Sequence, residues 1–136
     1  MKYRIELTEN QFKTVQHGLE TWERMMMGQF MDFADELALN GYNYDKSDPE
    51  NDEKFKAYIE RRNECRELME RAYRAACPVP QNKTDDMLVI EDIWAAMRYQ
   101  MWKDRPEPKS HDTVDSRKPM GVSNEPIPKI ERTGIL

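Results

Sequence analysis

The sequence contains few of the residues that usually fill a protein core. Leu, Ile, Val and Phe together account for 23 of its 136 residues, a low share for a globular protein. Ten Met, three Trp and six Tyr add to the side chains that could be buried. We therefore expect one small domain with a thin, adaptable core that a partner chain completes in part.

Long apolar runs and an excess of positive charge are also missing. No run approaches the roughly 18 residues that a membrane span needs, and the first residues show no signal-peptide pattern. The 26 acidic residues outnumber the 21 basic ones, which gives a net charge of −5 and argues against general DNA or RNA binding. Two Cys without close spacing fit a reducing compartment. We expect a protein of the cytoplasm that does not enter a membrane.

Catalytic and metal-binding patterns are scarce. Cys65 and Cys77 are twelve residues apart, and His17 and His111 lie far from both, so no pair has the close spacing of a structural metal site. The five Gly are scattered, and the sequence has no phosphate-binding glycine loop and no Gly-x-Ser-x-Gly elbow. We expect neither an enzyme nor a bound metal or cofactor.

The start of the chain predicts a strand followed by a helix. Tyr3, Ile5 and Leu7 alternate with charged residues, which is the two-residue period of a half-buried strand. Thr8 follows, with Gln11 three residues later, so the pair can form a capping box at the start of a helix.

Apolar residues at steps of three and four predict three helices, over residues 9–39, 49–76 and 85–103. Gly18 and Gly28 interrupt the first helix, and each suggests a bend or a close approach of another segment. Five of the eight Pro lie after residue 104, where no helical period remains.

The expected fold class is mainly α with minor β: a short N-terminal strand, three helices and an extended Pro-rich tail. The predicted organisation is a domain over residues 1–104 and a tail over residues 105–136, packed on the body or on a partner subunit. A lone strand must pair its backbone groups elsewhere, either with residues 127–131 of the tail or with another subunit. A homo-oligomer, a dimer or a tetramer, is therefore expected.

Clusters of carboxylates leave one enzymatic alternative open. Glu20 with Glu23, and Glu64 with Glu67, resemble the first metal-binding motif of all-helical nucleotide pyrophosphohydrolases, but the second motif, a Glu followed three residues later by Asp, is absent. Arg residues interleave with the acids of residues 61–74, which favours a solvated, salt-bridged helix face. A metal-dependent nucleotide hydrolase is the weakest hypothesis.

Two groups of basic and aromatic residues remain. Arg24 and Gly28 would share a face of the first helix, which leaves a polar notch beside Gln29. Arg98 and Trp102 are four residues apart on the third helix, and an Arg beside an indole can stack on a base or hold a phosphate. The alternative is structural: Arg98 pairs with an acid such as Asp32 or Asp35, and Trp102 packs under the tail.

Three segments carry a family resemblance. Residues 24–30 read Arg-Met-Met-Met-Gly-Gln-Phe, residues 98–104 read Arg-Tyr-Gln-Met-Trp-Lys-Asp, and residues 123–130 read Ser-Asn-Glu-Pro-Ile-Pro-Lys-Ile. In this order they resemble a family of small tailed-phage proteins and, more loosely, phage immune-evasion proteins that act as nucleotide sponges. The resemblance implies an oligomer in the host cytoplasm that sequesters a cyclic nucleotide second messenger of bacterial defence without cleaving it.

The expected ligand contacts follow from that hypothesis. Arg24 and Arg98 would bind phosphate, Trp102 or Tyr99 would stack on a base, and Gln29 would read a base edge or hold Arg24. The tail would act as a lid. The expected ligand-binding residues are Arg24, Gln29, Arg98, Tyr99, Trp102, His111 and Lys118, with Arg24, Gln29, Arg98 and Trp102 around one pocket.

A different class of function stays open beside this one. The chain could be a protein-binding module that inhibits or adapts a host protein. Its mark would be an exposed apolar patch, for which the run Met25–Met27 is the candidate.

Overall fold

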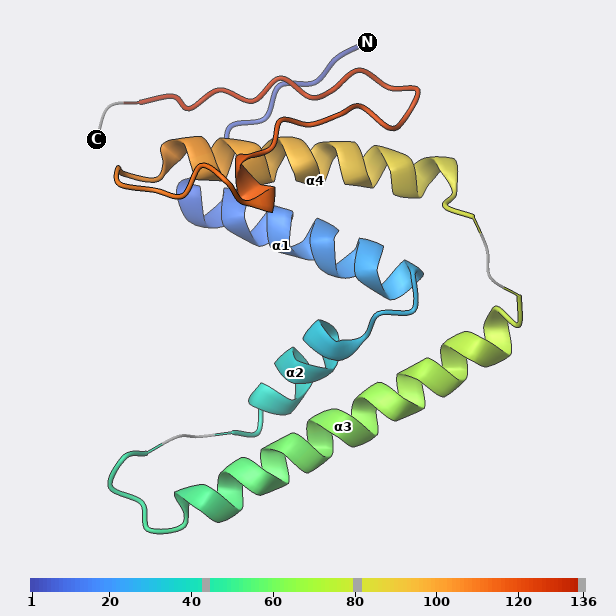
Figure 1. Ribbon diagram of the computed structural model, residues 1–136, viewed down its shortest axis with the longest axis vertical. Coiled ribbons are helices and arrows are strands. Elements are labelled where there is room, and N and C mark those ends of the chain that lie inside the picture. The colour runs from blue at the N-terminus through green and yellow to red at the C-terminus, as the bar shows by residue number, and fades with distance from the viewer. Residues whose placement is uncertain (43–44, 80–81, 135–136) are drawn as a thin grey trace. The chain divides into compact units, whose positions relative to one another are not determined.

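The computed structural model describes residues 1–42, 45–79 and 82–134. The chain divides into two compact units, one formed by Met1–Glu23 with the residues from Lys83 onward, the other by Arg24–Asn82. The elements, shown in Figure 1, are α1 (Glu9–Met26), α2 (Met31–Leu39), α3 (Asn51–Ala76), α4 (Asp85–Asp104) and the 3₁₀ turn η1 (Val114–Ser116).

The expected N-terminal strand is wrong, because no described residue lies in a strand. Residues 2–7 are extended, but Tyr3 is 85% and Ile5 76% exposed, so their alternation buries no face. The segment runs near the last part of the tail (Figure 1), where the charge of Arg4 acts on Glu131. The anticipated neighbour is thus present, but no hydrogen-bonded ladder is formed between them in the described part of the chain.

The expected number of three helices is also wrong, because the helix expected over residues 9–39 is two helices. α1 ends at Met26 and α2 begins at Met31. Gly28 between them has a φ of +80°, and a Cβ at this position would lie 2.8 Å from the ring carbon Cε1 of Tyr73. The backbone therefore turns at a residue where both the conformation and the space require glycine.

The second unit is a pair of helices of unequal length. Phe30, Ala34 and Ala38 are buried at steps of four residues along α2, and α2 packs on α3. Phe30 meets Tyr73 edge to face at 5.8 Å between ring centroids. Because α2 has 9 residues and α3 has 26, α2 covers only part of α3, and side chains such as Leu68 stay exposed.

The first unit is organised around α4. Its apolar side packs through Met87, Ile90 and Met97, all of which are buried. Lys83, just before α4, places its Nζ 3.6 Å from Glu23 on α1. The tail lies along α4 (Figure 1) and contacts it at η1 and through side-chain hydrogen bonds described below.

Two helix starts are confirmed as the sequence predicted them. The backbone N–H of Thr8 donates to Oε1 of Gln11 at 2.9 Å, and the N–H of Gln11 donates to Oγ1 of Thr8 at 3.2 Å. At α4 the N–H of Met87 donates to Oγ1 of Thr84 at 3.3 Å. Each hydroxyl satisfies one of the N–H groups that a helix start leaves unpaired.

The core is thin in both units. Eight apolar residues of the described chain are buried, three of them Ala, and no large side chain there is less than 2% exposed. That a partner chain completes this core stays a prediction.

Candidate functional site: the cationic and aromatic face of α4

Positively charged side chains lie on aromatic rings along α4 and the loop that follows it. A cation held against a ring in this way is attracted by the negative face of the ring. The pairs are Arg98 with Trp94, 4.6 Å from Cζ to the ring centroid, Lys103 with Tyr99, 4.9 Å from Nζ, and Lys109 with Trp102, 4.5 Å from Nζ.

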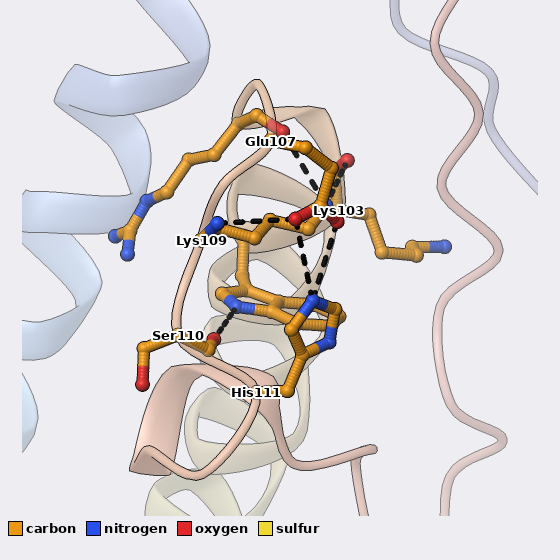
Figure 2. Close-up of polar contacts among 7 residues, drawn as sticks. Lys103, Glu107, Lys109, Ser110 and His111 are labelled. Carbon is orange, nitrogen blue, oxygen red and sulfur yellow. Dashed lines mark hydrogen bonds and ion pairs between the residues drawn. The ribbon is translucent and has the colours of Figure 1, made fainter.

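Trp102 is the centre of a small cluster (Figure 2). Its indole Nε1 donates to the carbonyl oxygen of Ser110 at 2.7 Å. Tyr99 stacks on it with ring centroids 5.8 Å apart, and His111 meets it edge to face at 5.1 Å. With Lys109 over the same ring, a base that stacked on Trp102 would have to displace one of these neighbours.

Lys109 closes the C-terminal end of α4. Its Nζ donates to the carbonyl oxygens of Lys103 at 2.9 Å and Arg105 at 3.3 Å (Figure 2). These carbonyls lack partners inside the helix, and a cation there is favoured by the helix dipole. The N–H of Lys109 and the ring of His111 lower the pKa of Glu107 by hydrogen bonding to its carboxylate. The loop after α4 therefore folds as a cap.

Arg98 stands apart from this cluster. Its Nε is buried without a hydrogen-bond partner, and so is Nε1 of Trp94, the residue under its guanidinium. Within the described ranges Arg98 has no ion-pair partner either. Two donors four residues apart on one helix face thus lack an acceptor, and leaving such a group unsatisfied costs about 1–3 kcal/mol. Each of the two atoms would need an acceptor, such as an oxygen of an anion, to be satisfied.

The seven residues expected at the ligand site fall into two groups. Tyr99, Trp102 and His111 come together in the first unit, as described above. Arg98 lies on α4 in the same unit, and the exposed Lys118 lies on the tail. Arg24 and Gln29 belong to the second unit.

The notch expected at Arg24 is not formed as a helical face, because α1 ends before Gly28. Arg24 accepts a backbone hydrogen bond from the N–H of Gln29 at 2.8 Å, and its Nε lies 3.5 Å from Oδ2 of Asp32. The convergence of Arg24 and Gln29 with Arg98 and Trp102 on one pocket stays a prediction.

Sequence reasoning missed three residues of the α4 face. Trp94 was not singled out, although its position four residues before Arg98 is the same spacing that singled out Trp102. Lys103 lies four residues after Tyr99 on the same helix, so this spacing could have indicated its contact with the ring. Lys109 carried no signal of its own, because its contacts depend on how the loop after Asp104 folds.

The other polar cluster of the first unit joins Lys83 to the buried Glu23 and the half-buried Glu91. Nζ of Lys83 lies 2.6 Å from Oε2 of Glu91 and 3.6 Å from Oε1 of Glu23. Burial and the charge of Glu91 raise the pKa of Glu23. Lys83 serves as the cation for both carboxylates, so the cluster ties α1 to α4.

Two further properties of the chain bear on function. In residues 1–42, 45–79 and 82–134 no three His, Cys, Asp or Glu side chains gather in a way that could hold a metal ion. No helix there is long and apolar enough to cross a membrane.

Comparison with known protein families, with curated proteins and with solved structures finds no match for this chain. The resemblance to small tailed-phage proteins therefore stays a prediction from the sequence.

Proposed function

We propose that this protein binds a nucleotide signal and holds it without chemical change. The observation that supports the proposal is the pair of unsatisfied donors at Arg98 and Trp94. Both atoms are donors only, so the group that completes them must bring acceptors. A phosphate offers several acceptor oxygens and a charge opposite to that of the guanidinium.

The aromatic residues of the same helix suit the rest of a nucleotide. Trp94 and Tyr99 both lie on α4, and a base can stack on an aromatic ring for about 1–3 kcal/mol. The net charge of −5 opposes binding of long nucleic acids, because these carry one phosphate after another. A small nucleotide needs only one local group of cations.

The class of nucleotide comes from the family resemblance. A phage protein that sequesters a cyclic nucleotide of bacterial defence, as an oligomer in the host cytoplasm, needs a site and no catalytic residues. Under this hypothesis the tail with His111 and Lys118 would add further contacts to the bound nucleotide.

Calorimetric titration tests this function directly. The full chain is titrated with cyclic mononucleotides, cyclic dinucleotides and their linear counterparts, and the recovered nucleotide is analysed for cleavage. We expect saturable binding of at least one cyclic member and its recovery intact. Absence of binding across the panel, or conversion of the nucleotide, would contradict the proposal.

A matched pair of Arg variants links the binding to the site. Arg98→Gln removes the charge and should abolish binding, while Arg71→Gln on the exposed part of α3 should leave it unchanged. If both variants bind as the unchanged protein does, the nucleotide lies elsewhere. Circular dichroism of each variant establishes that the helices are retained.

One observation favours a protein-binding module as second candidate. In the second unit the exposed large apolar side chains include Met26, Met27 and Met31, and flexible Met side chains suit adaptable binding surfaces. Replacing Met27 by Ser would weaken capture of a host protein, whereas Arg98→Gln would not. The two variants therefore separate this candidate from the first.

A further inference from the structure

The first unit contains a cavity between α4 and the C-terminal tail. Its volume is about 180 Å³. It lies on the side of α4 away from Arg98, because Ala96 and Gln100, each two residues from Arg98, project from the opposite side of the helix. Its lining residues are Ala96, Tyr99, Gln100, Lys103, Pro119, Ile127, Pro128 and Ile130.

Apolar and polar side chains both line the cavity, and it is open to solvent. Ala96 lies on its α4 side, Ile127 and Ile130 face it from the tail, and Gln100 and Lys103 add polar groups. A closed apolar cavity of about 150 Å³ accepts one benzene molecule, so an open cavity of this size has room for one six-membered ring with a polar substituent directed toward solvent.

Lys103 brings a positive charge to the rim of the cavity. Lys103 is exposed, and its ammonium lies on the ring of Tyr99. No carboxylate pairs with Lys103 in the described part of the chain. An anionic group on a ligand could therefore reach Lys103 while its apolar part enters the cavity.

The tail that roofs the cavity is held in place. Asp92 on α4 accepts hydrogen bonds from the N–H groups of Val122 and Ser123 at 2.8 Å and 2.9 Å. These residues lie between the two stretches of the tail that line the cavity. Gly121, with a φ of +73°, lets the chain turn there, and the side chain of Ile127 packs against it. The tail segment that covers the cavity is therefore held in position without a bound ligand.

We propose that this cavity is a second binding site, for a compact aromatic monocarboxylate whose ring lies against Ile127 and Ile130 and whose carboxylate meets Lys103. The site differs from the nucleotide site proposed above, because it takes a ligand of a different class and uses Lys103, Ile127 and Ile130 in place of Arg98 and Trp94. Tyr99, a stacking candidate for the nucleotide, also lines this cavity.

Titration of the full chain with benzoate, followed by NMR, tests the proposal. Benzyl alcohol and benzylamine serve as neutral and cationic probes of the same size. Benzoate should bind saturably and shift signals of residues 96–103 and 127–130, and it should bind at least fivefold more tightly than benzyl alcohol. Equal binding of the three probes, shifts elsewhere, or no saturation would overturn the proposal.

Substitutions then separate the charge from the cavity. Lys103→Gln should weaken benzoate about five- to tenfold, the size of a lost charge-assisted contact near the surface, and leave benzyl alcohol unchanged. Lys56→Gln on α3 is the matched control and should change neither. If Lys103→Gln leaves benzoate binding unchanged, the carboxylate does not meet Lys103 and the proposal fails.

A larger side chain in the floor tests the cavity itself. Ala96→Leu should abolish benzoate binding and leave nucleotide binding unchanged, which also keeps the two proposals distinguishable. If Ala96→Leu does not fold, Ile130→Phe fills the same space from the tail and should likewise abolish benzoate binding. Retention of benzoate binding in the folded filled variant would show that the ring does not enter the cavity.

Discussion

Ser123 donates two hydrogen bonds, one from its backbone N–H and one from its hydroxyl, to the carboxylate of Asp92 thirty-one residues earlier in the chain. The N–H of Val122 adds a third. Asp92 is only 3% exposed. A buried carboxylate with three donors holds an extended segment that has no regular secondary structure of its own.

Asp92→Asn should therefore release the tail. An amide of the same size keeps one acceptor oxygen but presents an N–H₂ group to donors, so at least one of the three hydrogen bonds is lost. We expect a loss of stability of about 1–3 kcal/mol and faster proteolysis within residues 117–130. Asp112→Asn in the exposed loop is the control. A variant as stable and as resistant as its parent would mean that the tail is held by other contacts.

The same contact predicts how attachment of the tail depends on pH. Burial by itself would raise the pKa of Asp92, but the hydrogen bonds from Ser123 and Val122 together outweigh it and lower the pKa. Because the folded-state pKa lies below the unfolded value of about 3.9, the stabilisation is complete above that pH and is lost as the pH falls through the folded-state pKa.

Hydrogen exchange of the tail amides at a series of pH values, corrected for intrinsic exchange rates, measures this dependence. Protection at Val122 and Ser123 should persist through mild acid and disappear only below about pH 4. Loss of protection between pH 6 and pH 5 would contradict the assignment, since no protonation of Asp92 is expected there.

Glu23 should give the opposite pH dependence. Burial, then the charge of Glu91, raises its pKa above the unfolded value. The protonated form is therefore favoured in the fold, and the stability that this group contributes is greatest at low pH and falls as the pH rises from about 4.3 to the folded-state pKa. Glu23 and Glu91 titrate together, so the change belongs to the pair.

Glu23→Gln removes this titration while keeping the shape of the side chain. The melting temperature of the variant minus that of the parent should therefore be more positive at pH 7 than at pH 4. Glu6→Gln, in the exposed N-terminal segment, should show the same difference at both pH values. A difference for Glu23→Gln that does not change with pH would mean that Glu23 is not held in its buried position.

The sequence predicted the start of α1 correctly but was wrong about the N-terminal strand and the number of helices, for a physical reason. The capping box formed by Thr8 and Gln11 depends on residues within one helical turn, so its signal is complete in a short stretch. The alternation of Tyr3 and Ile5 indicates a strand only if one face of the segment is buried. Residues 1–8 alone do not determine whether another part of the chain covers that face.

The candidate site shows the same limit. The spacing of Arg98 and Trp102 drew attention to α4, and the sequence left open whether Trp102 would meet a ligand or the tail. The contacts of Trp102 with Ser110 and His111 depend on the path of the loop after α4. Likewise, the sequence around Asp92 does not distinguish it from other acidic helix residues, because its hydrogen-bond donors lie about thirty residues later in the tail.

Gly28 and Gly18 offer a direct test of which glycine breaks the first predicted helix, because the sequence treats both alike. Gly28 has positive φ and would place a Cβ 2.8 Å from Tyr73, whereas a Cβ at Gly18 within α1 would meet nothing within 4 Å. Gly28→Ala should therefore destabilise the protein by about 1–3 kcal/mol through backbone strain and the clash. Gly18→Ala should stabilise it by about 0.5–1 kcal/mol, since Ala is the better helix former.

Urea unfolding of both variants measures the change in the free energy of unfolding, which should have opposite signs in the two. Equal effects would mean that the chain continues as one helix through Gly28.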